Sequence, residues 1–303
     1  MSASSDQPNA SPGLDSTARL ENALRAAAGP VPTLAAAWFA AFLLALVQSP
    51  EEALLIVLGF GGAFVAGLVG VGGAIVMVPL LLYVPPLLHL PRLDIHTVAG
   101  ISMVQVAAAG AGGVLGHLHH GQIRGRLVTT LGGGMALGSL VGAALSWRVP
   151  ASVLTALFAT LALSAAVVMF LPRRPPDESG GRHHPAVLIG SGLALGGLVG
   201  MVGAGGGFLL APLMLYLMHV PLRVAVSSSL AIVLLSGLAG TIGKAATGQV
   251  EWLLALSLVT GALPGARLGA VVGHRLSVRT LGWALGTLIG MVALKMWWDI
   301  LRT

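Results

Sequence analysis

The chain has 303 residues, of which 56% are hydrophobic and 9% are charged, and its formal net charge is +6. A soluble domain carries about 25% charged residues, so this composition excludes a soluble globular protein and predicts a chain that lies mostly in a membrane. The absence of cysteine excludes disulfides, cysteine metal sites and thiol catalysis. The Lys and Arg residues fall almost wholly in connectors, where they orient a membrane protein, so no nucleic-acid partner is expected.

The N-terminal region differs from the rest of the chain. Residues 1–30 begin with a polar stretch rich in Ser, Pro and Asp, and we expect a disordered or surface-helical tail. The apolar stretch 31–48 has two interpretations, a secretory signal and an extra short transmembrane helix. The residues that follow, Gln48–Glu52, fit a signal cleavage site poorly, so the helix is favoured.

Eight further apolar runs follow, most of them near the roughly 20 residues that span a bilayer. Two of the runs are too long for one simple span. The runs are about 53–88, 97–117, 127–147, 152–171, 186–218, 223–243, 252–273 and 279–300.

The two long runs carry the same glycine-rich motif. Gly70–Pro79 reads GVGGAIVMVP, and Gly203–Pro212, 133 positions later, reads GAGGGFLLAP. Further glycines recur at a spacing of 127, among them Gly110 and Gly237. The sequence therefore predicts an all-α polytopic membrane protein of two homologous four-helix repeats, each opening with a broken helix. The expected domains are repeat 1 at 53–171, a linker at 172–185 and repeat 2 at 186–301.

The path of each broken segment decides the topology, and two alternatives are open. If each segment returns to the side where it began, ten basic residues share one side of the membrane and four face the other; the four are Arg92, Arg148, Lys244 and Arg302. If each segment crosses once, the division is seven against seven. The positive-inside bias favours the first alternative, which makes the repeats inverted and places the linker in the cytoplasm.

The glycine breaks are the first candidate site. Glycine permits positive φ and close backbone approach, and a helix that restarts after a break presents free N–H groups to an anion. The candidate residues are Gly70, Gly72, Gly73, Gly203, Gly205 and Gly206. Close helix packing is the alternative interpretation. Packing is favoured for two other series, in which glycine recurs every fourth residue: Gly134, Gly138 and Gly142, and Gly261, Gly265 and Gly269.

Polar residues inside the predicted spans are the second candidate. Ser102 and its repeat-2 counterpart Ser229, together with Gln105, can donate hydrogen bonds to an oxyanion or bond neighbouring helices. Arg267 is the only arginine near the middle of a predicted span, where it can bind an anion or extend toward the membrane surface. Lys244 can attract anions to the mouth of a pathway or be a solvated residue at a helix end, and the second interpretation is favoured.

All ten acidic residues lie in tails, connectors or helix ends, which argues against a cation carrier and against a membrane hydrolase built on paired acids. No catalytic residue, metal or cofactor is expected, and the chain is not expected to be an enzyme.

These motifs resemble those of the sulfite exporter TauE/SafE family. The resemblance rests on the doubled G-x-G-G-x5-P block and on the doubled Gly-Gln connector, Gly121-Gln122 and Gly248-Gln249, and it covers about 53–301. It implies a bacterial inner-membrane permease of about eight spans for a small sulfur-containing or organic anion, such as sulfite or a sulfonate.

We therefore expect a secondary transporter that works by alternating access between the two repeats. An anion sensor and a passive anion channel of the same fold are the alternatives. The expected partners are the anionic substrate and membrane lipid, with a homo-oligomer left open.

Overall fold

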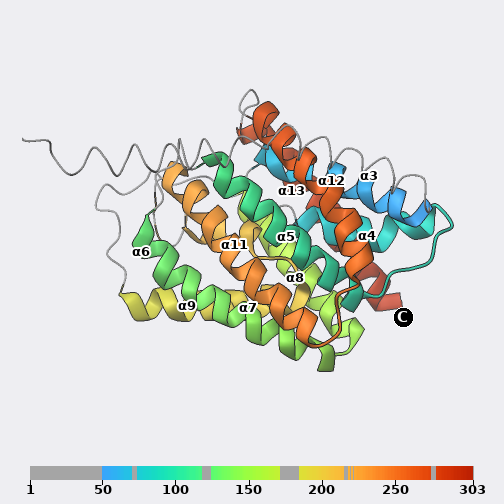
Figure 1. Cartoon of the computed structure of the whole chain (residues 1–303), viewed down its shortest axis with the longest axis horizontal. Coiled ribbons are helices and arrows are strands. Elements are labelled where there is room, and N and C mark those ends of the chain that lie inside the picture. The colour runs from blue at the N-terminus through green and yellow to red at the C-terminus, as the bar shows by residue number, and fades with distance from the viewer. Residues whose placement is uncertain are drawn as a thin grey trace, which may run out of the picture. The chain divides into compact units, whose positions relative to one another are not determined.

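The computed structural model describes residues 50–69, 74–117, 124–170, 184–214, 218, 220, 222–273 and 278–302. The tail at 1–30, the expected helix at 31–48, the first glycine break at 70–73 and linker residues 172–183 lie outside these residues. All regular elements in the described ranges are helical (Figure 1). The α-helices are α3 (Pro50–Val69), α4 (Ala74–Leu87), α5 (Ile95–His117), α6 (Gly125–Leu127), α7 (Gly133–Leu145), α8 (Ala151–Phe170), α9 (Pro185–Val202), α10 (Gly207–Pro212), α11 (Leu222–Ala246), α12 (Trp252–Gly273) and α13 (Val278–Arg302). The π-helical turn η1 (Val128–Gly132) precedes α7, and the 3-10 turn η2 (Ser146–Arg148) follows it.

Six helical segments in the described residues are long and apolar enough to cross a bilayer, which confirms the all-α, multi-span prediction. They are Ile95–Gly112, Gly125–Arg148, Ala151–Val168, Pro185–Val202, Ser228–Ala246 and Trp252–Gly269. A shorter apolar helix covers Ile75–Leu87. Large apolar side chains are exposed along several of these segments, for example Val141, Leu193 and Leu256. A lipid environment accounts for such exposure, since water would not favour it.

Two helix pairs pack backbone against backbone along their glycine series. A β-carbon on any of these glycines would meet the main chain of the partner helix, so only glycine allows the close approach. On α7, the glycine–partner pairs with α9 are Gly134–Ile189, Gly138–Leu193 and Gly142–Gly197; on α12, the pairs with α3 are Gly261–Ile56, Gly265–Phe60 and Gly269–Phe64. The packing role predicted for both series is confirmed.

The same contacts give the relative directions of the helices. Residue numbers rise together across α7 and α9 and across α12 and α3, so each pair runs parallel. Across α5 and α11 the numbers move in opposite senses, since Ala107 meets Gly237 whereas Gly110 meets Leu234. These two helices are therefore antiparallel, as Figure 1 also shows.

The broken segments return the chain to the side where it started. α5 runs parallel to α12, because Gly100 meets Gln249 and Gly112 meets Leu263. Since α12 is parallel to α3, helices α3 and α5 run in the same direction, and the intervening segment with α4 must bring the chain back. In the second half, α9 and α11 both run parallel to α7, so the segment with α10 also returns.

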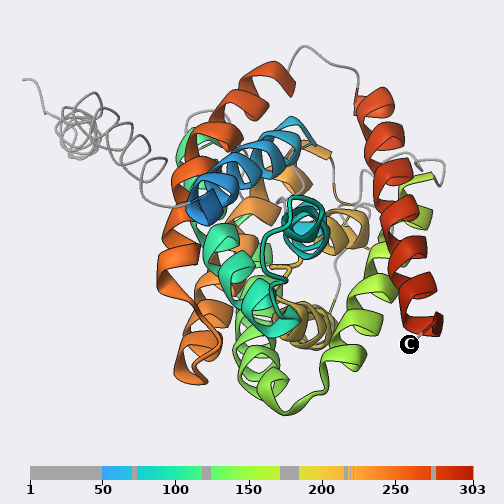
Figure 2. The same ribbon diagram turned by 90° about the vertical axis from the view of Figure 1, so that its right-hand side faces the viewer.

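Helix α13 lies at the edge of the bundle. It packs beside α8 and also contacts α4 (Figure 2).

Candidate functional site

The second glycine cluster breaks the helix as predicted. α9 ends at Val202, and Gly203 follows in the left-handed region with φ +76° while its N–H donates to the carbonyl of Val199. Gly205 and Gly206 also have positive φ, at +61° and +75°. Glycine adopts this conformation with little strain, whereas a β-carbon opposes it. Of the predicted break residues, those of the second cluster are described, and Gly70, Gly72 and Gly73 lie outside the described residues.

Helix α5 packs directly on this break and carries buried polar groups there. A β-carbon on Gly203 would meet Ala99, and one on Gly205 would meet Val106. Ser102 lies one turn from each of these residues, on the same face of α5. The Ser102 hydroxyl and both amide atoms of Gln105 are buried and have no hydrogen-bond partner among the described residues. Leaving a buried polar group unpaired costs about 1–3 kcal/mol, so such groups call for a physical explanation.

The opposite side of the break is tied to α11 and α7 by hydroxyl groups. The Ser236 Oγ donates to the carbonyl of Gly205 at 3.0 Å, and the Ser139 Oγ donates to the carbonyl of Ser236 at 2.8 Å. All three residues are buried. The irregular backbone is thus enclosed by protein, which is the condition under which a broken helix is tolerated at membrane depth.

Lys244 corrects the interpretation drawn from the sequence, because it is not solvated. Its side chain is fully buried. The Nζ atom donates to the Ser146 Oγ at 2.7 Å, to the Gln249 Oε1 at 2.9 Å and to the Met201 carbonyl at 3.0 Å. Met201 is two residues before Gly203, so the lysine is bonded to the end of the helix that leads into the break.

The Gly-Gln connector explains how the lysine is enclosed. Gly248 takes φ +70°, and the N–H of Gln249 donates back to the carbonyl of Lys244 at 3.0 Å. This left-handed glycine ends α11 and turns the chain back over its last turn. The Gln249 amide then lies against Lys244, and its Nε2 donates to Thr247 and to the carbonyl of Ala143.

Electrostatics makes this cluster unusual. Its three acceptors are a hydroxyl, an amide oxygen and a carbonyl, and none carries a charge. None of the acidic residues in the described part of the chain is buried. Removing an ammonium group from water costs several kcal/mol, and neutral acceptors recover only part of that cost. A protonated Lys244 lacks a protein counter-charge in the described residues, an arrangement that favours an anion.

The other predicted residues fall into two groups. Ser229 is buried in α11, three residues before Ile232 of the face that meets α7. Arg267 is exposed on α12 and lies apart from the cluster. The sequence-based reasoning missed Lys244, Ser146 and Gln249 as one unit; the recurring Gly-Gln connector was the signal that pointed to them.

Comparisons with known proteins place the chain among probable membrane transporters. The family model for the sulfite exporter TauE/SafE family matches residues 54–296. The chain is 29% identical over 249 residues to the probable membrane transporter protein YunE of Bacillus subtilis, covering 75% of this chain and 90% of the relative. It is 29% identical over 259 residues to a probable membrane transporter protein of Xylella fastidiosa, covering 82% and 96%. No solved structure matches the chain.

Proposed function

Since the chain belongs to the sulfite exporter TauE/SafE family, a family of probable membrane transporters and not of enzymes, we propose that it is a secondary transporter for a small anion. The substrate class is a sulfur-containing or organic anion such as sulfite or a sulfonate. We place the protein in the inner membrane of a bacterium, in keeping with its bacterial relatives.

The observation that carries this proposal is the buried Lys244. A buried charge within a membrane-spanning helix is a functional hypothesis by default, because it is costly unless something compensates it. Here the described acceptors are all neutral. An anion bound beside Lys244 supplies the missing negative charge, and a cation substrate would be repelled.

The architecture we propose is two repeats related by an approximate twofold axis. Its support is a set of contacts that recur with the two halves exchanged. Gly134 of α7 meets Ile189 of α9, and Gly261 of α12 meets Ile56 of α3. Gly261 lies 127 positions after Gly134, and Ile189 lies 133 positions after Ile56, so the two contacts join counterpart residues of the two halves. The interface of α12 with α3 is therefore equivalent to that of α7 with α9. Exchanging the two halves also maps the contact between α5 and α11 onto itself. Ala107 meets Gly237, and their counterparts at a spacing of 127, Leu234 and Gly110, also meet.

The same pair supports inverted topology. α5 and α11 are counterparts in the two repeats, and they run antiparallel. A twofold axis along the membrane normal would make counterpart helices parallel, whereas an axis in the membrane plane makes them antiparallel. The returning path of both broken segments agrees with the ten-against-four division of basic residues. We therefore place the linker 172–185 in the cytoplasm and Arg148, Lys244 and Arg302 toward the external side.

In the proposed cycle, the two glycine breaks form facing half-sites and the repeats rock against one another. Around the second break, Ser102 and Gln105 offer neutral donors and Lys244 offers the charge. Ser229 remains a proposed contact here, and Arg267, which is exposed on α12 apart from this cluster, remains a proposed contact outside it. Outward movement of one negative charge releases about 2.3 kcal/mol per 100 mV of membrane potential, so export needs no further coupling ion.

The test is a screen of purified protein in liposomes. Sulfite, sulfate, thiosulfate, sulfoacetate, taurine and acetate are compared by thermal stabilisation and by tracer uptake. We expect saturable uptake of at least one anion, and we expect Gly205→Val to abolish it because the β-carbon meets Val106. Gly190→Val is the matched control, since nothing lies within 4 Å of its β-carbon position. Stabilisation without uptake would favour the sensor, and uptake that never saturates would favour the channel.

A further inference from the structure

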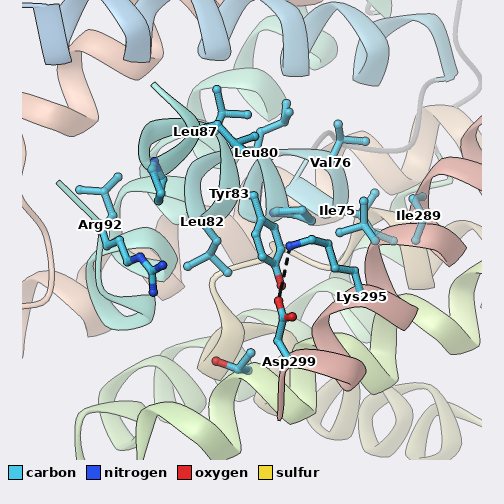
Figure 3. Close-up of a pocket in the computed structure, with 16 residues that line it drawn as sticks. Ile75, Val76, Leu80, Leu82, Tyr83, Leu87, Arg92, Ile289, Lys295 and Asp299 are labelled. Carbon is cyan, nitrogen blue, oxygen red and sulfur yellow. Dashed lines mark hydrogen bonds and ion pairs between the residues drawn. The ribbon is translucent and has the colours of Figure 1, made fainter. Parts of the chain in front are cut away.

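A pocket of about 900 Å³ lies between α4, the start of α8 and the last turns of α13, apart from the Lys244 cluster (Figure 3). Eleven of its sixteen lining residues are apolar. They extend along α4 from Ile75 to Leu87, a helical length of about 18 Å at 1.5 Å per residue. None of the lining residues belongs to the cluster around Lys244, so this pocket is a separate feature of the molecule.

One wall of the pocket carries an ordered polar group. The Tyr83 hydroxyl donates to the Asp299 carboxylate at 3.0 Å, and the Lys295 Nζ lies 3.5 Å from the same oxygen. The Nζ also lies 3.9 Å from the centroid of the Tyr83 ring, in a cation–π contact. Figure 3 shows the lysine directed over the ring toward the carboxylate. These two contacts position the ammonium group, whose side chain is 57% exposed.

The charge balance of the lining is positive. It contains two cations, Arg92 and Lys295, and one anion, Asp299. Asp299 is shared with Lys295, whereas Arg92 is exposed and has no carboxylate partner among the described residues. Figure 3 shows Arg92 on the far side of Leu82 from the Tyr83–Asp299 pair. A negatively charged group is thus the favoured occupant of the polar end.

The size and lining of the pocket define the rest of the ligand. Pockets of 300–1,000 Å³ with mostly apolar walls and a few placed polar groups suit drug-sized molecules. A small inorganic oxyanion would fill little of this volume and would leave the apolar wall uncovered. A hydrocarbon segment lying along α4 would cover that wall, and 18 Å is comparable to the roughly 15 Å depth of one bilayer leaflet.

We propose that this pocket binds an amphipathic organic anion, with the acidic head at Arg92 and Lys295 and the hydrocarbon body along α4 and α13. The chemistry is shared by two sources, an anionic phospholipid of the surrounding bilayer and a free amphiphile such as a long-chain sulfonate or carboxylate. This site does not depend on the transport function proposed above.

The experiment titrates the purified full chain with decanesulfonate and, in parallel, with decanol of equal chain length. We expect saturable binding of the sulfonate and at least tenfold weaker binding of the alcohol. Arg92→Gln or Lys295→Gln should weaken sulfonate binding about tenfold, and Val292→Trp should block it by filling the apolar part. Arg148→Gln is the control, because this exposed arginine stacks on Trp147 outside the pocket.

The second arm adds phosphatidylglycerol and measures the bound lipid by native mass spectrometry. Lipid that decanesulfonate displaces, and that Val292→Trp excludes, supports the site with a bilayer lipid as its source. Sulfonate binding without retained lipid supports it with a free amphiphile as its source. Equal binding of sulfonate and decanol, no sulfonate binding by the wild-type chain, or full binding by both charge variants would overturn the proposal.

Discussion

The Nζ of Lys244 donates a 2.7 Å hydrogen bond to the Oγ of Ser146, which joins the last turn of α11 to the end of α7. Both residues are fully buried, and the lysine also reaches the carbonyl of Met201 beside the second helix break. One charged side chain therefore connects three helices at the point where the backbone becomes irregular. A change in substrate occupancy at this lysine would act on all three.

Replacing Lys244 should remove anion binding without unfolding the protein. The three N–H donors of Lys244 are already bonded within the protein, so the lysine attracts an anion through its charge. At an effective dielectric constant of about 20 and a separation of about 6–8 Å this attraction is about 2–3 kcal/mol, so Lys244→Met should weaken anion affinity roughly 10- to 100-fold. Lys244→Met removes the cost of burying an ammonium group but leaves three neutral acceptors without that donor, so the melting temperature without anion should change little. Thermal shift with and without substrate measures both quantities.

Arg126→Gln is the control for this prediction, since Arg126 is exposed and lies near the opposite end of the span Gly125–Arg148 from Ser146. Its small-anion affinity should equal that of the wild type. Wild-type affinity in Lys244→Met, together with a large loss of stability, would assign Lys244 a structural role instead.

Replacing Ser102 or Gln105 should lower anion affinity without lowering the stability of the anion-free protein, unlike replacing an ordinary hydrogen-bonded buried residue. Their side chains have no partner among the described residues, so Ser102→Ala or Gln105→Leu should leave the anion-free protein as stable or more stable. Anion affinity should fall severalfold if these groups serve the substrate. Ser139→Ala is the comparison, because its hydroxyl bonds the Ser236 carbonyl and its loss should cost about 1 kcal/mol. Denaturation with and without anion separates these cases, and a destabilised Ser102→Ala would argue against a ligand role.

The glycine interface should be sensitive to a single methyl group. Gly138→Ala places a β-carbon against the backbone of Leu193, and overpacking of this kind costs about 1–3 kcal/mol. Gly133→Ala lies on the same helix but meets nothing within 4 Å, so it should be neutral or slightly stabilising. Comparing the two melting temperatures tests the interface, and equal values would show that α7 and α9 do not pack as described.

Much of the fold could be predicted from the sequence, because helices in a bilayer need long apolar runs and close pairs need glycine every fourth residue. The second break, the packing series of α7 and α12, and the all-α class followed from these patterns. The role of Lys244 did not, because its burial depends on Gly248 turning Gln249 back over α11, a contact that hydropathy cannot express. The exposure of Arg267 could not be predicted from the sequence either, because hydropathy does not show which side of α12 faces the other helices.

The returning path of the first broken segment makes a labelling prediction. The wild-type chain has no cysteine, so single cysteines report their own exposure. Glu51→Cys, Leu88→Cys and Arg148→Cys should all react with an impermeant thiol reagent from outside the cell, because α3 begins where α4 ends. Arg126→Cys, at the other end of the span Gly125–Arg148, should react only after permeabilisation. Labelling of Glu51→Cys and Leu88→Cys from opposite sides would show that the segment crosses the membrane once.

Counterflow in liposomes is the sharpest test of whether an anion crosses by alternating access at a site that includes Lys244. Vesicles loaded with unlabelled anion are diluted into labelled anion, and uptake is followed over time. In the wild type we expect saturable uptake of labelled anion that is faster when the vesicles contain unlabelled anion. In Lys244→Met we expect this uptake to disappear. Uptake that rises linearly with concentration and ignores internal anion, or equal counterflow in Lys244→Met, would contradict this mechanism.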